Sequence, residues 1–234
     1  MGVMKELSKG NGRTRLYLVK RLLLDLFYPN RCPICGEPIP FDEYFCRLCG
    51  GKFSKPPKPP KTAALGELDG FEAVTVYDNV SIPFVGELKK NSNGYALSGA
   101  AFKIYERLLE TDILSSVDVI TYMPMDKKSL YKRGYNQTKI MAAEISGLSG
   151  LPCIELLRKV KDTAEQKKLG AKERRTNVAG AFALRGKVDI NGGRVLVIDD
   201  VSTTGSTLSE AARALKTGGA SKVYGAVFAK TELR

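Results

Sequence analysis

Two adjacent carboxylates in this chain stand at the end of an apolar run and directly before a cluster of hydroxyl side chains. Residues 195–198 predict a buried strand, and Asp199 and Asp200 close it. The residues that follow are Ser202, Thr203, Thr204, Gly205, Ser206 and Thr207. Buried carboxylates need hydroxyl donors or a divalent cation, and free N–H groups at the start of the next helix favour an anion. The pattern therefore indicates a site for a sugar that carries a phosphate.

The strand geometry sets a condition on this site. Neighbouring residues in a strand point to opposite faces, so we expect the pleat to break at Asp199 for both carboxylates to reach one ligand. A buried strand with a well-capped helix is the alternative, but capping does not require two acids and so many hydroxyls. The chain has no histidine, so any general base is Asp, Glu, Lys, Tyr or the substrate itself.

Four of the five cysteines form two C-x2-C pairs, with ten residues between the pairs. They are Cys32, Cys35, Cys46 and Cys49. This spacing predicts one tetrahedral structural zinc site, with no position left open for catalysis. Two disulfides or redox-active pairs are the alternatives, and a cytosolic chain makes stable disulfides unfavourable. Cys153 is left over and is predicted to be a small core residue.

The chain has 234 residues and a formal net charge of +12, of which the first 62 residues hold 12 Lys+Arg and 5 Asp+Glu. This bias suits a polyanionic partner such as nucleic acid, although a basic protein without such a partner remains an equal alternative. We find neither a run of about 20 apolar residues nor a signal peptide. We therefore expect a cytoplasmic protein without a transmembrane segment.

The composition divides the chain into four parts. Residues 1–30 predict a tail and an amphipathic helix, residues 31–51 the zinc-binding module, residues 52–62 a Pro/Lys linker and residues 63–234 the main domain. The helix places apolar side chains at helical spacing over 16–28: Leu16, Val19, Leu23, Leu26 and Phe27. We expect this face to pack on its own domain. A membrane-surface or partner helix is the alternative, helped by Lys20 and Arg21.

In the main domain, segments with the apolar pattern of strands alternate with segments with that of helices. Strands are predicted at 71–77, 118–124, 179–184, 194–199 and 222–230, and helices at 83–90, 95–109, 136–148 and 206–217. This alternation predicts an α/β fold with a mostly parallel sheet and helices on both faces. Ligands of such sheets bind outside the carboxyl ends of the strands.

The acid pair and its hydroxyl loop resemble the motif of type I phosphoribosyltransferases, which binds 5-phosphoribosyl 1-diphosphate (PRPP). Three further segments resemble the ComF family, named for competence for DNA uptake: the four-cysteine module, "YKRGYNQ" (131–137) and "EQKKLGAKERRTNVAGAF" (165–182). The likeness covers nearly the whole chain from about Leu22. It implies a Rossmann-like phosphoribosyltransferase domain joined to the zinc module.

The resemblance implies a role for each matching residue. Asp199 and Asp200 hold the ribose hydroxyls with magnesium nearby, and Arg133 neutralises the leaving pyrophosphate, so these three are the predicted catalytic residues. The predicted PRPP-binding residues are Tyr122, Met123, Pro124, Asp199, Asp200, Ser202, Thr203, Thr204, Gly205, Ser206 and Thr207. The basic stretch 158–175 resembles a mobile flap, with Lys161, Arg174 and Arg175 as candidates to reach the substrate.

Two functions follow from the resemblance. The first is magnesium-dependent transfer of phosphoribosyl to an acceptor that the sequence does not identify, in a protein of DNA uptake. The second is a non-catalytic competence protein that binds single-stranded DNA, placed in the cytoplasm or at the inner face of the membrane beside other competence proteins. The candidate nucleic-acid residues are Arg31, Arg47, Lys52, Lys55, Lys132 and Arg133. Tyr44 and Phe45 either stack on bases or pack the zinc module, and we expect packing. We also expect the module to lie near the site.

Overall fold

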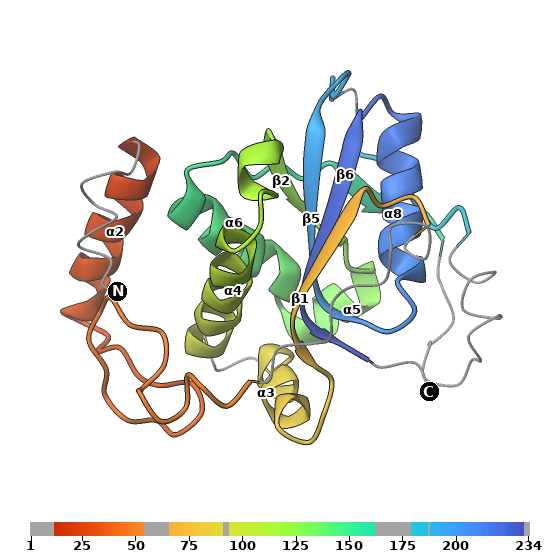
Figure 1. Ribbon diagram of the computed structural model, residues 1–234. Helices are drawn as coiled ribbons and strands as arrows, with labels where there is room; N and C mark the ends of the chain where they lie inside the picture. The colour runs from red at the N-terminus through yellow and green to blue at the C-terminus, as the bar shows by residue number, and fades with distance from the viewer. Residues whose placement is uncertain (1–11, 54–65, 91–93, 162–178, 187, 232–234) are drawn as a thin grey trace.

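A four-stranded parallel sheet forms the centre of the molecule, with helices on both faces and the N-terminal segment at one side (Figure 1). The computed structural model describes residues 12–53, 66–90, 94–161, 179–186 and 188–231. The strands are β1 (Gly70–Val76), β2 (Val119–Tyr122), β5 (Arg194–Ser202) and β6 (Lys222–Lys230), in the order β1-β6-β5-β2. The parallel sheet predicted from the apolar runs is therefore confirmed.

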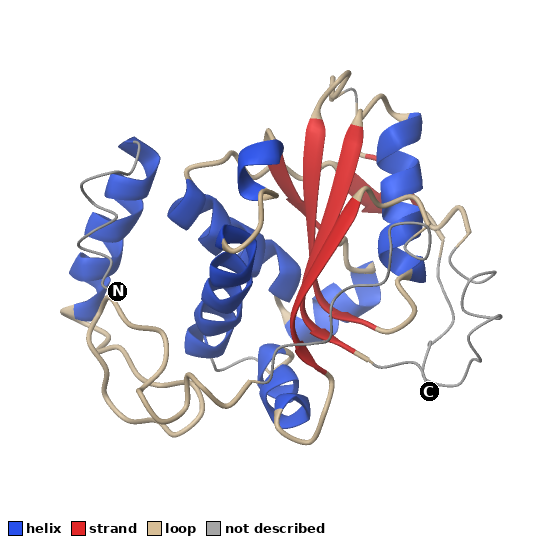
Figure 2. Ribbon diagram, in the orientation of Figure 1, coloured by secondary structure: helices blue, strands red, loops and turns tan. Residues whose placement is uncertain are grey.

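Helices cover the two faces of this sheet unequally (Figure 2). One face carries α3 (Ser81–Leu88), α4 (Gly94–Leu109) and α6 (Gln137–Ser149), and their apolar side chains form one core cluster with β5 and β6. The other face carries α8 (Ser206–Thr217), whose Leu208 and Leu215 belong to a second cluster. A short 3-10 helix (Leu114–Ser116) precedes β2. The central strands are buried on both sides, as continuous apolar runs require.

Two details of the strands differ from the sequence prediction. The segment 179–184 contributes only β4 (Phe182–Leu184), which pairs antiparallel with β3 (Leu157–Lys159) outside the main sheet. Strand β5 does not end at Asp199, because its ladder with β6 continues to the pair Ser202–Lys230. The predicted strand end at Asp199 is therefore wrong, although the pairing of β5 with β2 stops at the pair Tyr122–Ile198.

Helix α5 (Lys127–Arg133) was not predicted, since its seven residues carry no apolar period. Its ends nevertheless carry clear capping residues. Asp126 accepts a hydrogen bond from the backbone N–H of Ser129 at 2.8 Å, and Gly134 closes the helix with a φ of 80°. A non-glycine residue rarely adopts this left-handed conformation.

The N-terminal helix exposes the face that was expected to pack. Helix α2 (Gly12–Asp25) buries Thr14 and Leu18. Its predicted packing residues are exposed over half or more of their surface: Leu16, Val19, Leu23, Leu26 and Phe27. The helix turns a different side toward α6, because the Tyr17 hydroxyl bonds to Glu144 there. Among the described residues, no helix combines the length and the apolar character that a membrane span needs.

The cysteine-bearing segment packs onto the main domain through aromatic rings. The Tyr44 ring stacks on Phe102 of α4 with centroids 4.2 Å apart and an angle of 6° between the planes. The Phe45 ring contacts Phe84 of α3 at 5.8 Å, and Phe84 contacts Phe228 of β6 at 4.9 Å. Tyr44 and Phe45 are both buried. The expectation that these two rings pack is confirmed.

This packing predicts a large difference between two substitutions in the same segment. Phe45→Ala should lower the free energy of unfolding by about 3–5 kcal/mol, because it leaves a cavity in the aromatic cluster. Leu48→Ala is the matched control and should change it by less than about 0.5 kcal/mol, since Leu48 is 85% exposed. Urea unfolding followed by circular dichroism measures both. Equal effects would mean that the segment does not pack on the domain in solution.

Candidate functional site

A cavity of about 240 Å³ lies where strands β2 and β5 end. The lining residues come from the end of α3, the loop from β2 into α5, α5 itself, the start of α6, the end of β3, and β5. The lining side chains that carry charge are Lys89, Asp126, Arg133, Lys159, Asp199 and Asp200. This is the position in which parallel sheets bind ligands.

Asp200 is the most heavily bonded group of the cavity. Its carboxylate is buried, and its Oδ2 lies 3.4 Å from the Lys89 ammonium. The same oxygen accepts a hydrogen bond from the Gln137 amide at 3.0 Å. The Arg133 guanidinium in turn donates to the amide oxygen of Gln137. A chain of polar contacts thus joins two cations from different helices to one carboxylate.

Asp199 lies beside Asp200 and lines the same cavity. Burial raises the pKa of the Asp199 carboxyl well above its usual value of 3.8, and the charge of Asp200 raises it further. The backbone N–H of Asp200 opposes this rise by donating to Asp199 Oδ1 at 2.9 Å. Two carboxylates this close bind a proton or a cation in common more readily than either does alone.

The hydroxyl loop lies between β5 and α8, as the sequence predicted. Gly205 caps α8 with a φ of 77°, and an added Cβ there would meet no atom within 4 Å. The Thr204 hydroxyl bonds to the Ser206 hydroxyl and accepts from the Ser206 backbone N–H at 3.3 Å. Thr203 and Thr207 are half-exposed, whereas Ser202 is buried in the strand. These residues adjoin the 240 Å³ cavity along the chain but are not part of its lining.

At the end of β2, backbone groups matter more to the site than side chains do. Met123 and Pro124 line the cavity. The Met123 carbonyl accepts from the Thr138 hydroxyl at 2.7 Å and from the Asn136 amide at 3.1 Å, which ties α6 to this loop. The Tyr122 ring is buried and not among the lining side chains, and burial followed by the charge of Glu155 raises its pKa.

Sequence reasoning missed Lys89, Gln137 and Lys159. Gln137 ends the segment "YKRGYNQ", so the motif contained it but gave it no role. Lys159 belongs to the basic stretch 158–175, and its ammonium lies 3.9 Å from the Asp126 carboxylate. The sequence could not predict that Lys89 belongs to the site, because nothing in residues 83–90 shows that the end of this helix meets Asp200.

Other predicted residues lie away from this cavity. The Lys161 ammonium donates to the Ala179 carbonyl at 3.1 Å and is not among the lining side chains. Arg174, Arg175 and Lys55 lie outside the described residues. Arg31, Arg47 and Lys52 are exposed on the cysteine-bearing segment, and Lys132 is exposed on α5.

The four paired cysteines converge on one point. Their Sγ atoms all lie within 4.8 Å of one another, and those of Cys35 and Cys46 are 3.6 Å apart. Tetrahedral zinc with Zn–S bonds of about 2.3 Å spaces its sulfurs by about 3.8 Å, so the donor set fits zinc. Burial raises the pKa of Cys32, but backbone N–H groups, that of Cys46 first, lower it to about 6 overall. The first pair turns through Gly36, whose φ is 76°.

Comparison with known proteins agrees with both parts of the molecule. Residues 125–232 match the phosphoribosyl transferase domain model, and residues 23–67 match the double zinc ribbon domain model. Among solved structures, the purine phosphoribosyltransferase of Pyrococcus horikoshii aligns with a TM-score of 0.37 and 22% identity, over 59% of this chain and 77% of that one.

Two curated relatives align over most of their length. Competence protein F of Haemophilus influenzae is 26% identical over 82% of this chain and 81% of its own. DNA utilization protein YhgH of Escherichia coli is 27% identical over 82% of this chain and 80% of its own. The molecule thus has a type I phosphoribosyltransferase fold with an N-terminal zinc ribbon. Within that class, the chain is similar over most of its length to these two proteins of competence and DNA utilization.

The cysteine cluster predicts one bound zinc per chain. Cys49→Ala should lose the metal and unfold the segment around residues 30–50, because metal binding supplies the folding free energy of such small modules. Cys153→Ala is the matched control, since Cys153 stands outside the cluster, and it should retain the zinc. Metal analysis by mass spectrometry checks both variants. A metal-free protein with two disulfides in this segment would contradict the assignment.

The raised pKa of Asp199 predicts that stability falls as the pH rises. The folded state binds the Asp199 proton more tightly than the unfolded state, so the free energy of unfolding decreases from about pH 4 upwards. Asp199→Asn should therefore be more stable than the natural protein at pH 8, with a difference that shrinks toward pH 4. Thermal unfolding across this pH range measures the difference.

Asp118→Asn is a control for which the expected change in stability at pH 8 has the opposite sign. Hydrogen bonds from Arg194, first those from its side chain and then that from its backbone N–H, lower the pKa of Asp118 to about 2. That aspartate stabilises the fold above its usual pKa and stops doing so as the pH falls toward 2. Asp118→Asn should therefore be less stable than the natural protein at pH 8. If both variants shifted stability in the same direction, the burial argument for Asp199 would be wrong.

Proposed function

We propose that this protein binds PRPP at the Asp199–Asp200 pair and transfers its phosphoribosyl group to an acceptor in a magnesium-dependent reaction. The observation that carries the proposal is the placement of two adjacent carboxylates in a cavity with Lys89 and Arg133, directly before a helix start capped by Gly205. Carboxylates accept from sugar hydroxyls, and the helix start attracts a phosphate. The match of residues 125–232 to the phosphoribosyl transferase domain supports the same ligand.

Each end of PRPP has suitable partners in this arrangement. Asp199 and Asp200 would accept from the ribose hydroxyls, and the N–H and hydroxyl groups of residues 203–207 would donate to the 5-phosphate. The pyrophosphate would lie toward Pro124, within reach of the cations Lys89 and Arg133 that line the cavity. Tyr122 would bind PRPP only through its backbone, because its ring is buried and does not line the cavity.

The chemistry of such a transfer suits a chain without histidine. The bond between the ribose C1 and the pyrophosphate oxygen breaks, the electron pair leaves with the pyrophosphate, and the acceptor forms the new bond to C1. Positioning and charge neutralisation lower the barrier, so no protein nucleophile is needed. Oxygen ligands such as Asp199 and Asp200 suit magnesium, which when bound supplies positive charge to the leaving group.

Lys89 would act before and during this reaction. In the structure its ammonium lies 3.4 Å from Asp200, where it partly offsets the repulsion between the two aspartates. Binding of PRPP with a cation would take over that neutralisation and release Lys89 toward the pyrophosphate. The cavity, lined by three cations and three carboxylates, would thus keep its charge balance when the ligand and a cation arrive together.

We further propose that the reaction, or the binding of PRPP alone, serves the handling of DNA during uptake in the cytoplasm. The names of the relatives, Competence protein F and DNA utilization protein YhgH, support this role. A non-catalytic single-stranded DNA-binding protein is the second candidate. The exposed cations on the zinc ribbon, Arg31, Arg47 and Lys52, favour it.

Titration calorimetry with PRPP tests the first proposal. The natural protein should bind PRPP with magnesium and bind it much more weakly without the metal. Asp199→Asn/Asp200→Asn should lose the magnesium-dependent binding, because the ribose hydroxyls lose their acceptors. Asp118→Asn should keep it, since Asp118 stands at the opposite end of β5 beside Arg194. Absence of binding to the natural protein would overturn the proposal and leave DNA binding as the candidate.

A further inference from the structure

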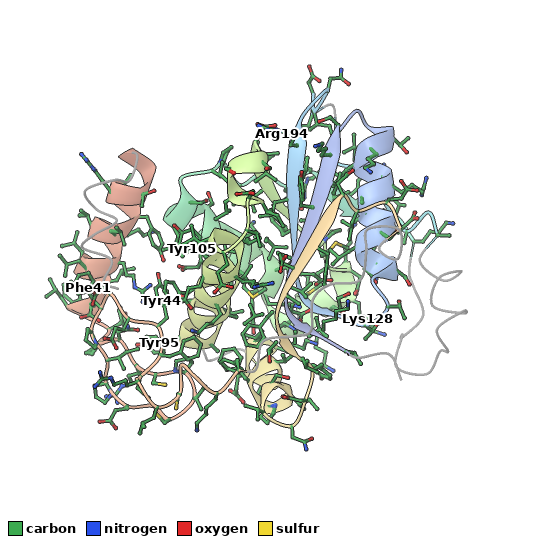
Figure 3. The ribbon with its side chains drawn as sticks, in the orientation of Figure 1. Phe41, Tyr44, Tyr95, Tyr105, Lys128 and Arg194 are labelled. Atoms are coloured by element: carbon green, nitrogen blue, oxygen red, sulfur yellow. The ribbon has the colours of Figure 1, made fainter. Side chains whose placement is uncertain are left out.

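A second and larger cavity lies between α2, the segment 28–44, α4 and α6. Its volume is about 520 Å³, within the range of small-molecule sites. It shares no lining residue with the Asp199–Asp200 cavity. Figure 3 shows Tyr44 and Tyr95 in the space between α2 and α4, where both line this cavity.

One wall of the cavity offers a flat, rigid surface. The guanidinium carbon of Arg21 lies 3.6 Å from the centroid of the Tyr44 ring. The opposite face of that ring stacks on Phe102, so Tyr44 is held from both sides. Arg21 is held further by a 2.9 Å hydrogen bond from its guanidinium to the Glu43 carbonyl. Nucleobases stack on such guanidinium planes and on aromatic rings.

Another wall offers a hydrogen-bond acceptor. Glu144 of α6 lines the cavity and accepts a hydrogen bond from the Tyr17 hydroxyl. Burial, and then the charge of Glu144, raise the pKa of Tyr17, so this phenol keeps its proton. A carboxylate with oxygens directed to a cavity accepts from an exocyclic amino group, such as N4 of cytosine, and repels the carbonyl of thymine.

The charges around the cavity favour a ligand whose uncharged part lies inside and whose anionic part stays in solvent. Asp25 and Glu144 line it and disfavour an anion inside. Lys20 also lines it but is exposed, so its ammonium can meet a phosphate that stays in solvent. A void left by loose packing would have aliphatic walls and remain dry. Here aromatic and charged side chains form most of the walls, beside the aliphatic Leu24 and Ile140.

We propose that this cavity binds a single unstacked nucleobase that carries an amino group, stacked on Arg21 and hydrogen-bonded to Glu144. The nucleobase belongs to a single strand or to a free nucleotide. The site is separate from phosphoribosyl transfer and does not depend on it. The two sites share helix α6, because Gln137 contacts Asp200 and Glu144 lies about 10 Å further along the helix axis.

Fluorescence anisotropy with labelled oligodeoxycytidine and oligodeoxythymidine at low salt tests the proposal on the full chain. The natural protein should bind the cytidine strand more tightly. Arg21→Lys keeps the charge but removes the flat surface, and it should weaken that binding about tenfold. Glu144→Gln should remove the preference for cytidine over thymidine, because an amide bonds to either base. It still offers Tyr17 an acceptor oxygen.

Arg15→Lys is the matched control, since Arg15 is exposed on the same helix and does not line the cavity. It should bind as the natural protein does, and so should Asp199→Asn, which separates this site from PRPP binding. Competition by deoxycytidine monophosphate would identify a free nucleotide as the source of the base, whereas binding of the strand alone would identify single-stranded DNA. Unchanged binding in both Arg21→Lys and Glu144→Gln, or no binding of either probe by the natural protein, would overturn the proposal.

Discussion

The electrostatic repulsion between Asp199 and Asp200 is the constraint on which the site depends. A sheet edge tolerates two neighbouring carboxylates only where other groups neutralise or bond them. Lys89 and Gln137 do this for Asp200, and the backbone N–H of Asp200 does it in part for Asp199. The repulsion between the two carboxylates therefore lowers the stability of the fold, and contacts elsewhere in the molecule have to offset it. Natural proteins commonly accept such a cost at a functional site.

The zinc ribbon takes part in this support through the core. Phe45 of the ribbon contacts Phe84 of α3, and the residue that follows α3, Lys89, reaches Asp200. The packing of the ribbon and the position of the cation are thus linked through one short helix. A metal site without an open coordination position has a structural role, and here it holds the segment that carries Phe45.

Helix α6 connects the remaining parts of the molecule. Its first turn is tied to the end of β2 by the bonds of Asn136 and Thr138 to the Met123 carbonyl, and Gln137 bonds to Asp200. Further along, Glu144 bonds to Tyr17 and so anchors α2. The apolar face of α2 with Leu16, Val19 and Leu23 remains exposed as a result. The amphipathic pattern predicted the helix correctly, but it predicted the wrong side for packing.

The elements whose signal is local could be predicted from the amino-acid sequence. Apolar runs identify β1, β5 and β6, the C-x2-C pairs identify the metal cluster, and the acids before the hydroxyl loop mark a point within three residues of the end of β5. The features that join distant segments became visible only in the folded molecule: the pairing of β3 with β4, the ion pair of Lys89 with Asp200, and the cavity behind α2. The physical reason is that strand and turn patterns depend on neighbours in the chain. A buried charge instead takes whichever partner the packing of the whole core brings to it.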